Sequence, residues 1–302
     1  MEEYPLVSVI TINFNGLKDT KELLESLKDI DYPNIEIILT DNGSDQKPDG
    51  LQKEFPKLIL IKNDKNLGFA AANNIGIKQA NGKYILIINN DVIVKPDFLE
   101  PLMLSLKRNK NIGIVSPKIY YHHSPQTIQY AGFTNINSIS IRNKSIGFNE
   151  PETGKYDEER ETFYAHGAAF LFKSELIKKV GMMSEVFFLY YEEMDWCKQV
   201  RDQGYQINYV PQSVVYHKDS ATTGTNSPFK TYYLNRGRLI YMLRNVKYPL
   251  LILSTLYQIF FAFPKNLMAL LIQKKRDHAR AYRNAFGWFI KHFLDKKVKA
   301  DS

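Results

Sequence analysis

Lys83-Tyr-Ile-Leu-Ile-Ile-Asn-Asn-Asp-Val-Ile-Val-Lys-Pro-Asp97 is the stretch of sequence that decides the fold. Its apolar run from Tyr84 to Ile88 is rich in β-branched residues, which is typical of a strand buried on both faces. The run ends in Asn89-Asn90-Asp91, whose short polar side chains favour a turn. Ligands of open α/β sheets bind outside the carboxyl ends of the strands. Asp91 is therefore predicted to lie at the ligand edge of a sheet, with a purely turn-forming role as the other interpretation.

The alternation of strand and helix extends on both sides of this stretch. It predicts an α/β fold in which a largely parallel sheet lies between layers of helices. Between residues 120 and 160 the periodicity fades, and loops or short strands both fit. The predicted strands cover residues 6–13, 35–40, 58–62, 112–118, 164–172, 206–210 and 214–216, and the predicted helices begin near Leu17, Phe69, Pro96, Ser174 (as the cap) and Met194.

Polar clusters follow three of the predicted strands, at residues 11–15, 41–45 and 89–91. Three such clusters on one sheet edge are what a nucleotide site in this architecture requires. The sequence contains neither G-x-G-x-x-G nor a Walker Gly-Lys-Ser/Thr motif, so dinucleotide and P-loop chemistry lack their usual signature. Asn66-Leu67-Gly68 either brings backbone close to a phosphate at a helix start or only opens the helix.

The 302-residue chain carries a formal net charge of +8, and Cys197 is its single cysteine. One cysteine excludes an intramolecular disulfide and fits a reducing, cytoplasmic compartment. No charged segment followed by an apolar core opens the chain, so no signal peptide is expected. The basic excess lies mostly after residue 230. No nucleic-acid partner is expected, because zinc-finger spacing, an RNP-like segment and a basic recognition helix are all missing from the sequence.

A second chemical cluster lies at Glu192-Glu193, between an aromatic run and a predicted helix. Acidic residues are ordinary at a helix start, where the macrodipole favours them. The alternative is a general base placed beside the sheet edge. His217 follows the last predicted strand, as a structural histidine or as a ligand.

In this order the clusters resemble glycosyltransferase family 2, especially its rhamnosyltransferase-like and other bacterial polysaccharide-assembly members. The resemblance covers about residues 6–240. It implies a GT-A fold, a nucleotide-diphosphate sugar donor, a divalent cation and inversion at the anomeric carbon. The matching segments are residues 9–16, 40–44, 66–74 with 89–91, 167–168 and 188–197.

The resemblance also implies roles for single residues of the donor site. Asp41 would contact the nucleobase, Thr11 and Asn13 would line the nucleoside pocket, and Asn66 and Asn90 would bind the donor. Asp91 would coordinate Mg²⁺ or Mn²⁺, hard cations that suit oxygen ligands. A full Asp-x-Asp is absent, so His217 is expected to help complete the metal or diphosphate site.

For the reaction itself, the resemblance implies that Glu193 is the catalytic base, with Glu192 as the fallback. Asp195 would orient the helix or the acceptor, and Trp196 would contact substrate. Arg236 resembles a late basic site near the donor phosphates, and a solvated helix position is the other interpretation.

The C-terminal part combines an apolar stretch with many basic residues. Residues 249–264 and 267–272 are almost entirely apolar, and Pro264 and Lys265 are expected to interrupt them. Aromatic and basic residues alternate after Lys274, a pattern that suits helices lying on an anionic membrane surface. A helical hairpin packed on the catalytic domain, or a homodimer interface, is the alternative.

Together these observations predict three regions: a nucleotide-sugar-binding half at 1–118, an acceptor-binding and catalytic half at 119–225, and a helical, basic segment at 226–302. The predicted function is transfer of a sugar, with rhamnose favoured, to a glycan or lipid-linked saccharide in cell-surface polysaccharide synthesis. The enzyme would be peripheral at the inner face of the cell membrane. A nucleotidyltransferase, and a non-catalytic nucleotide-sugar-binding or membrane-scaffold module, are the alternatives.

Overall fold

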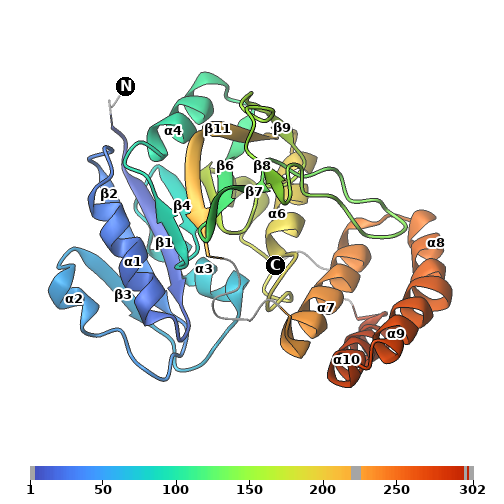
Figure 1. The fold of residues 1–302 in the computed structure, drawn as a ribbon. Coiled ribbons are helices and arrows are strands. Elements are labelled where there is room, and N and C mark those ends of the chain that lie inside the picture. Colours follow the sequence, from blue (N-terminus) through green and yellow to red (C-terminus); the bar gives the residue numbers. More distant parts are fainter. Residues whose placement is uncertain (1–3, 219–225, 296–297, 299–302) are drawn as a thin grey trace.

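A mixed β-sheet between layers of helices forms the body of the molecule, seen in the computed structural model, which describes residues 4–218, 226–295 and 298 (Figure 1). The strand order is β3-β2-β1-β4-β10-β6-β11-β5. The expected α/β architecture is confirmed. The first four strands of the chain are β1 (Val7–Asn13), β2 (Ile35–Asp41), β3 (Leu58–Lys62) and β4 (Tyr84–Ile88).

These four strands run parallel to one another, so their carboxyl ends share one edge of the sheet. Asn13 at the end of β1 lies opposite Asp41 at the end of β2. Tyr84–Ile88 is buried along its whole length, as the apolar run predicted. The polar residues after β1, β2 and β4 are therefore brought to one edge.

The second half of the chain completes the same sheet. β10 (Ala169–Lys173) pairs antiparallel with β4 and also pairs with β6 (Ile112–Tyr121). β11 (Gln206–His217) lies between β6 and β5 (Val92–Val94). The expected boundary at residue 118 falls inside β6, so the two predicted halves share one sheet. β11 also replaces the two strands predicted after Gln206, because only a register shift between Val210 and Val214 separates its parts.

Three short strands occupy the segment that the sequence did not resolve. They are β7 (Ser124–Tyr130), β8 (Glu150–Pro151) and β9 (Arg160–Thr162), and they pair with β6, β7 and β11 respectively. Short strands, rather than loops alone, therefore lie between residues 120 and 162.

Helices cover both faces of the sheet. The side chains of α1 and α4 pack on one face, and those of α3, α5 and α6 pack on the other. The bounds are α1 (Leu17–Lys28), α2 (Leu51–Glu54), α3 (Phe69–Gln79), α4 (Leu99–Arg108), α5 (Leu176–Val180) and α6 (Glu192–Asp202).

Three helix starts differ from the prediction. α4 begins at Leu99, because residues 95–98 form a turn closed by a bond from the Phe98 N–H to the Lys95 carbonyl. Ser174 does not cap α5, since its hydroxyl donates to the carbonyl of Lys83. α6 begins at Glu192 rather than Met194, which places both glutamates inside its first turn.

Helices make up the C-terminal segment of the described chain, as expected. α7 (Pro228–Asn245) packs against α6 and joins the core on the face of the sheet that α3, α5 and α6 cover. α10 (Arg276–His292) packs along α7. Between them, α8 (Leu250–Tyr257), the π-helical η1 (Gln258–Ala262) and α9 (Phe263–Ile272) follow without a break.

Pro264 and Lys265 interrupt the apolar run in the sequence, but they do not break the helix. The Phe263 N–H bonds to the Gln258 carbonyl five residues earlier, which widens the helix just before Pro264. Wide turns of this kind let a helix continue past a proline, which has no N–H to donate. Residues 250–272 therefore form one continuous helix.

Candidate active site

Asn13 organises the first two loops at the carboxyl edge of the sheet. Its Nδ2 donates to Asp41 Oδ1 at 2.8 Å and to Ser44 Oγ at 2.9 Å. Its Oδ1 accepts from the Gly16 N–H and from Thr20 Oγ1. Because these bonds occupy the amide, Asn13 shapes the edge of the predicted nucleoside pocket instead of projecting into it.

Thr11 and Asp41 bring buried polar atoms to the same edge. Thr11 Oγ1 and Asp41 Oδ2 have no hydrogen-bond partner among the described residues. Among the described residues, Asp41 Oδ2 has one ion-pair partner, Lys47 Nζ at 3.6 Å, on a side chain that is itself well exposed. A buried polar atom without a partner is costly. A base or ribose group that bonds to Asp41 Oδ2 would remove that cost.

Asn42 is a hub that sequence reasoning overlooked. Its Nδ2 donates to Asn66 Oδ1 at 2.9 Å, and its Oδ1 accepts from Asn63 Nδ2 and the Leu67 N–H. Asn66 Oδ1 also accepts from the Gly68 N–H. Asn66 is thus engaged in holding the loop before α3. The run Asp41-Asn42-Gly43 was the available signal, because asparagine beside glycine favours a bonded turn.

Asp91 and His217 lie side by side beyond the carboxyl end of β4. Asp91 precedes β5, and β5 pairs with β11 so that His217 lies opposite Val92. This pairing brings Asp91 Oδ1 and His217 Nε2 within 3.1 Å of each other, with both side chains largely buried. The two predicted metal ligands, 126 positions apart in the sequence, are therefore adjacent in space.

The hydrogen bonding of His217 makes this pair suitable for a cation. Its Nδ1 lies 2.8 Å from Gln129 Oε1, an atom that can only accept, so Nδ1 carries the proton. In this tautomer Nε2 presents its lone pair on the side of Asp91. Neighbouring ligands at about 2.1 Å from an octahedral cation are roughly 3.0 Å apart, close to the separation found here. The pair fits a divalent cation, and the hydrogen bond to Gln129 fixes the orientation of the His217 ring.

Asn90, the residue before Asp91, faces the other way. Its Nδ2 donates to Thr20 Oγ1 at 2.9 Å and to the Gly16 carbonyl at 3.3 Å. It thereby ties the turn after β4 to the start of α1. The structure shows a scaffold contact where donor binding was predicted.

His166 is a site residue that sequence reasoning did not select. Its Nδ1 accepts from the Ala168 N–H, and its ring lies parallel to that of Phe133 with centroids 5.9 Å apart. Its centroid is 6.0 Å from that of His217. Burial, reinforced by His217, lowers the pKa of His166 to about 3, so the ring is neutral and carries its proton on Nε2. A histidine followed by glycine just before a buried strand was the signal for it.

A strained turn positions the two glutamates. Tyr190 and Tyr191 have positive φ angles of 68° and 78°, which side chains other than glycine rarely adopt. The turn is held from two sides. The Phe69 N–H donates to the Phe188 carbonyl at 2.7 Å, and a Cβ at Gly68 or Gly237 would collide with the carbonyl of Phe188 or Tyr190. Such strain persists only where the surroundings enforce it, and it is common at functional sites.

Glu193 is the better placed of the two acids. Its carboxyl group lies 3.6 Å from the point where a Cβ at Gly167 would be, beside His166, and its side chain is only partly buried. Burial raises the pKa of Glu193 to about 7. Glu192 is almost fully buried, and burial together with the charge of Glu193 raises its pKa well above the usual value. At neutral pH Glu193 can exchange a proton with a substrate, whereas burial favours the protonated form of Glu192 inside the fold.

Asp195 and Trp196 belong to the core rather than to the site. Both oxygens of Asp195 accept from Arg244 Nε, at 3.0 and 3.1 Å, and Asn245 and Gln199 bond the same carboxylate. This fits the helix-orienting role and removes the acceptor role. Trp196 packs on Phe172, and its Nε1 donates to the Gly181 carbonyl. The predicted substrate contact of Trp196 is wrong, because only 1% of the residue is exposed.

Arg236 lies between α7 and α10. Its guanidinium donates to the Val186 carbonyl and lies over the Trp288 ring at 4.4 Å. Burial lowers its pKa. The solvated-helix interpretation does not match this partly buried position, whereas the donor-phosphate role stays a prediction.

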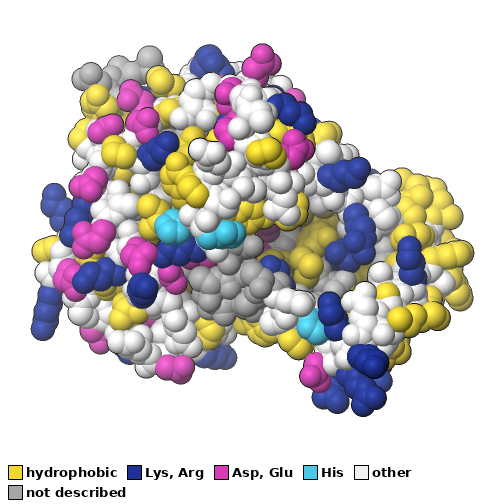
Figure 2. Space-filling model, viewed as in Figure 1, with side chains coloured by type: hydrophobic (Ala, Val, Ile, Leu, Met, Phe, Trp, Pro, Cys, Tyr) yellow, Lys and Arg dark blue, Asp and Glu magenta, His cyan; other side chains and the backbone are white. Residues whose placement is uncertain are grey.

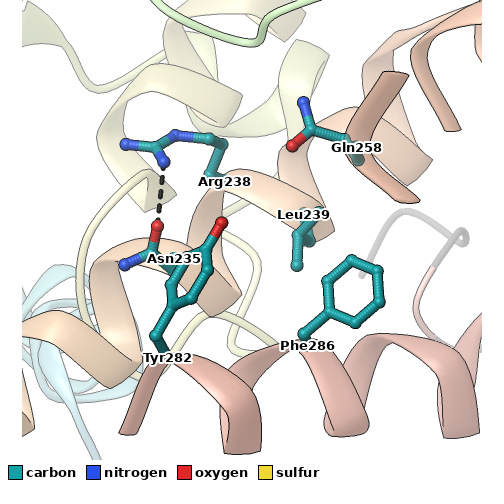
Figure 3. Close-up of a pocket in the computed structure, with 6 residues that line it drawn as sticks. All are labelled: Asn235, Arg238, Leu239, Gln258, Tyr282 and Phe286. Carbon is teal, nitrogen blue, oxygen red and sulfur yellow. Dashed lines mark hydrogen bonds between the residues drawn. The ribbon is translucent and has the colours of Figure 1, made fainter. Parts of the chain in front are cut away.

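A small cavity lies between α7, η1 and α10 (Figure 3). Its volume of about 10 Å³ is that of a single water at most. Arg238 and Asn235 both line the cavity, and Arg238 Nη1 donates to Asn235 Oδ1 at 2.9 Å. It is too small for a nucleotide, so the candidate site stays at the open carboxyl edge of the sheet.

Comparison with known protein families matches residues 8–181, more than half of the chain, to the family described as "Glycosyl transferase family 2". Uncharacterized protein y4gI of Sinorhizobium fredii is 27% identical over 259 residues, which are 82% of this chain. The chain spans only 28% of that relative's length. The dTDP-rhamnosyl transferase RfbF of Shigella flexneri is 23% identical over 282 residues, which are 89% of this chain and 90% of RfbF.

Two solved structures resemble the fold. GalNAc-T7, crystallised with UDP, GalNAc and Mn²⁺, has a TM-score of 0.63 at 16% identity, over 80% of this chain and 48% of its own. The mannosyltransferase PcManGT of Pyrobaculum calidifontis, in complex with GDP-Man and Mn²⁺, has a TM-score of 0.59 at 14% identity, over 98% of this chain and 86% of its own. The likeness confirms the expected GT-A fold.

Proposed function

Since the chain belongs to glycosyl transferase family 2 and is thus a glycosyltransferase, we propose that it uses a nucleotide-diphosphate sugar and a divalent cation, with inversion at the anomeric carbon. This assignment replaces the nucleotidyltransferase and non-catalytic alternatives. One arrangement carries the proposal: the Asp91–His217 pair lies beside His166, and the Glu193 carboxylate lies beside the next residue, Gly167.

Asp41 and the Asp91–His217 pair would bind different parts of the donor. Asp41 Oδ2 is a buried acceptor at the end of β2, suited to N–H or O–H groups of a nucleoside. Asp91 and His217 would hold Mg²⁺ or Mn²⁺ beside the diphosphate. When bound, the cation would neutralise charge that develops on the leaving nucleoside diphosphate. The described residues hold no group of three potential ligand side chains, so diphosphate oxygens and water would complete the coordination.

Glu193 would act on the acceptor. Its carboxylate takes the proton of the acceptor hydroxyl while that oxygen forms a bond to the anomeric carbon. The bond from the anomeric carbon to the diphosphate breaks on the opposite side, so the products are an inverted glycoside and a nucleoside diphosphate. A base with a pKa of about 7 suits this step at neutral pH. Neutral His166 would add no positive charge beside the metal pair and the base.

Rhamnose is the sugar that we propose first. RfbF, a dTDP-rhamnosyl transferase by name, matches this chain over nearly its full length, although at low identity. Galactofuranose, glucose and N-acetylhexosamines are the competing donors. The proposed acceptor is a glycan or lipid-linked saccharide of cell-surface polysaccharide synthesis, and the proposed location is the cytoplasmic face of the membrane. O-antigen biosynthesis protein RfbC of Myxococcus xanthus, 25% identical over 246 residues, supports that context.

A donor panel with Mn²⁺ tests the proposal. Thermal shift identifies the nucleotide sugar that stabilises the chain, and NMR of the transfer product reports its anomeric configuration. Asp91→Asn is expected to lower transfer at least about 100-fold, because a metal contributes several kcal/mol to the transition state. Asp97→Asn is the matched control, since Asp97 undergoes the same chemical change on the exposed turn before α4. Retention of the donor's anomeric configuration, or full transfer by Asp91→Asn without metal, would overturn the proposal.

A further inference from the structure

The continuous helix formed by α8, η1 and α9 presents an apolar stripe to solvent. Residues spaced by three or four positions along it are exposed, and Phe260 and Phe261 are exposed by 64% and 66%. Lys265 is the single charged residue between Leu250 and Ile272. A helix that faces the protein would bury such a stripe. The exposed apolar residues, here called the apolar stripe, are Leu250, Ile252, Leu253, Leu256, Tyr257, Phe260, Phe261, Met268, Leu271 and Ile272.

Basic residues flank the apolar stripe. Between residues 247 and 295 the sequence has eight Lys and Arg residues and only Asp277 and Asp295 as acids. Figure 2 shows the apolar side chains gathered along the edge that Figure 1 assigns to α8 and α9, with Lys and Arg side chains beside them over α10. An apolar surface bordered by positive charge complements an anionic lipid bilayer, in which acyl chains lie beneath negative headgroups.

The helix is long enough to cross a membrane, but its contacts oppose that orientation. By length and composition, Leu250–Ile272 qualifies as a span. However, α10 packs along it: the Phe263 ring stacks on Phe286 at 4.0 Å, and Asn266 bonds the hydroxyl of Tyr282. A spanning helix would draw α10 into the hydrocarbon with the exposed Arg280 and Arg283, where charged side chains are costly. A helix lying in the membrane plane keeps both the packing and the charges in favourable surroundings.

The protein-facing side of the same helix is bonded to the catalytic domain. Ser254 Oγ donates to the Ile139 carbonyl at 3.1 Å, and Gln258 Nε2 donates to the carbonyls of Ile139 and Ser140. Ile141, the next residue, accepts from the hydroxyl of Tyr191, which immediately precedes Glu192. One short loop therefore connects the helix to the turn that carries the proposed base.

We propose that residues 250–272 form a membrane-binding helix that lies in the plane of an anionic bilayer, with the apolar stripe among the acyl chains. Only the purpose of this placement rests on the proposed function. That purpose is to hold the turn before Glu193 at the membrane surface, where a lipid-linked acceptor lies. It identifies the partner as the bilayer itself. A second copy of the chain is the competing occupant, and its signature is dimerisation without lipid.

Vesicle binding by the full chain tests the partner. Flotation with phosphatidylcholine vesicles, with and without phosphatidylglycerol, is expected to show stronger binding to the anionic vesicles and weaker binding at high salt. Phe260→Glu is expected to lower binding at least about tenfold, because it places a charge among the acyl chains. Leu104→Glu is the matched control, since Leu104 is 58% exposed on α4, outside the apolar stripe. Equal loss in both variants, or no binding by the unchanged chain, would overturn the proposal.

Depth measurements test the orientation. Cys197 is buried, so cysteines introduced by Leu253→Cys, Phe260→Cys and Leu271→Cys accept a fluorophore selectively. Brominated lipids should quench all three at a similar shallow depth, about 5–10 Å below the headgroups. A spanning helix would instead place position 260 deepest and the other two near opposite surfaces.

Light scattering without lipid separates the competing occupant. A monomer that binds vesicles supports the bilayer, whereas a dimer that Phe260→Glu dissociates, with no vesicle binding by either, would assign the stripe to a second copy. Neither measurement needs turnover. A chain that binds anionic vesicles but transfers no sugar would contradict the proposed function and leave the membrane helix in place.

Discussion

Gly237 in α7 and Tyr190, just before α6, are in direct backbone contact. A Cβ atom added at Gly237 would lie 2.5 Å from the Tyr190 carbonyl oxygen. Tyr190 is itself in the left-handed region, with φ of 68°. Helix α7 thus supports the strained turn that aims Glu193, and this support depends on a position without a side chain.

Gly237→Ala should therefore impair both stability and activity. The added methyl group forces α7 and the turn apart, which is expected to lower the free energy of unfolding by about 1–3 kcal/mol. It should also lower kcat, because the Glu193 carboxylate moves from its place beside Gly167. Chemical denaturation and transfer kinetics measure the two effects.

Gly287→Ala is the matched control. Gly287 also lies within a helix, but a Cβ there would meet nothing within 4 Å. Alanine favours helix by roughly 1 kcal/mol over glycine, so this variant should be as stable as the unchanged chain or more stable. Comparable destabilisation in both variants would show that α7 does not support the turn in the way described.

Glu193→Gln should separate catalysis from stability. Removing a general base is expected to lower kcat by about 10²–10⁴-fold. Glu192→Gln should retain most activity, because Glu192 is almost fully buried with a raised pKa that favours its protonated form, which glutamine resembles. Kinetics on the identified donor distinguish the two acids. Loss of activity in Glu192→Gln alone would move the base to that position.

The pH dependence provides a second measure of Glu193. Its pKa is raised from 4.5 to about 7, so the folded state binds its proton more tightly than the unfolded state. The resulting stabilisation is complete below pH 4.5 and is lost as pH rises through about 7. Glu193→Gln should therefore raise Tm relative to the unchanged chain at pH 8 and much less at pH 4. Activity of the unchanged chain should rise across the same interval, because the base must be deprotonated.

Gln129→Leu should weaken cation binding without touching either proposed ligand. Gln129 Oε1 fixes the His217 ring, and loss of such a supporting hydrogen bond typically costs about 10–100-fold in metal affinity. Mn²⁺ titration in the presence of the nucleoside diphosphate measures this affinity. Gln126→Leu, on the exposed part of the same strand, should leave it unchanged. If both variants bind Mn²⁺ as the unchanged chain does, His217 is not held through Gln129.

The sequence predicted those parts of the structure that depend on local pattern. The strands around Val7–Asn13, Ile35–Asp41 and Tyr84–Ile88 are continuous apolar runs that end in polar turns, and the structure confirms them. The parallel pairing then brings the turns to one edge without further information. The start of α4 was misplaced because the competing turn at 95–98 satisfies the same backbone groups.

Contacts between distant segments were beyond sequence reasoning. Gln129 and His166 reach the metal pair only through strand pairing across the middle of the chain, where periodicity is weak. The helix continues through Pro264 because of a local π-turn, which the composition of the sequence does not predict. Asp195 looked like a site acid because its partner Arg244 lies 49 positions later.

Asp195→Asn gives the last prediction, which tests that correction. Asp195 and Arg244 are both nearly inaccessible and form the ion pair that joins α6 to α7. Removing one charge of a buried pair leaves the other uncompensated and typically costs about 3–5 kcal/mol, so the variant should unfold at markedly lower denaturant concentration. Asp202→Asn, which removes an exposed ion pair at the end of the same helix, should cost about 0–1 kcal/mol. Replacing both partners, as in Asp195→Asn with Arg244→Met, should recover part of the loss because no lone charge remains buried.

At a temperature where Asp195→Asn is still folded, its KM for donor and acceptor should equal that of the unchanged chain. A raised acceptor KM with unchanged stability would return Asp195 to the substrate site.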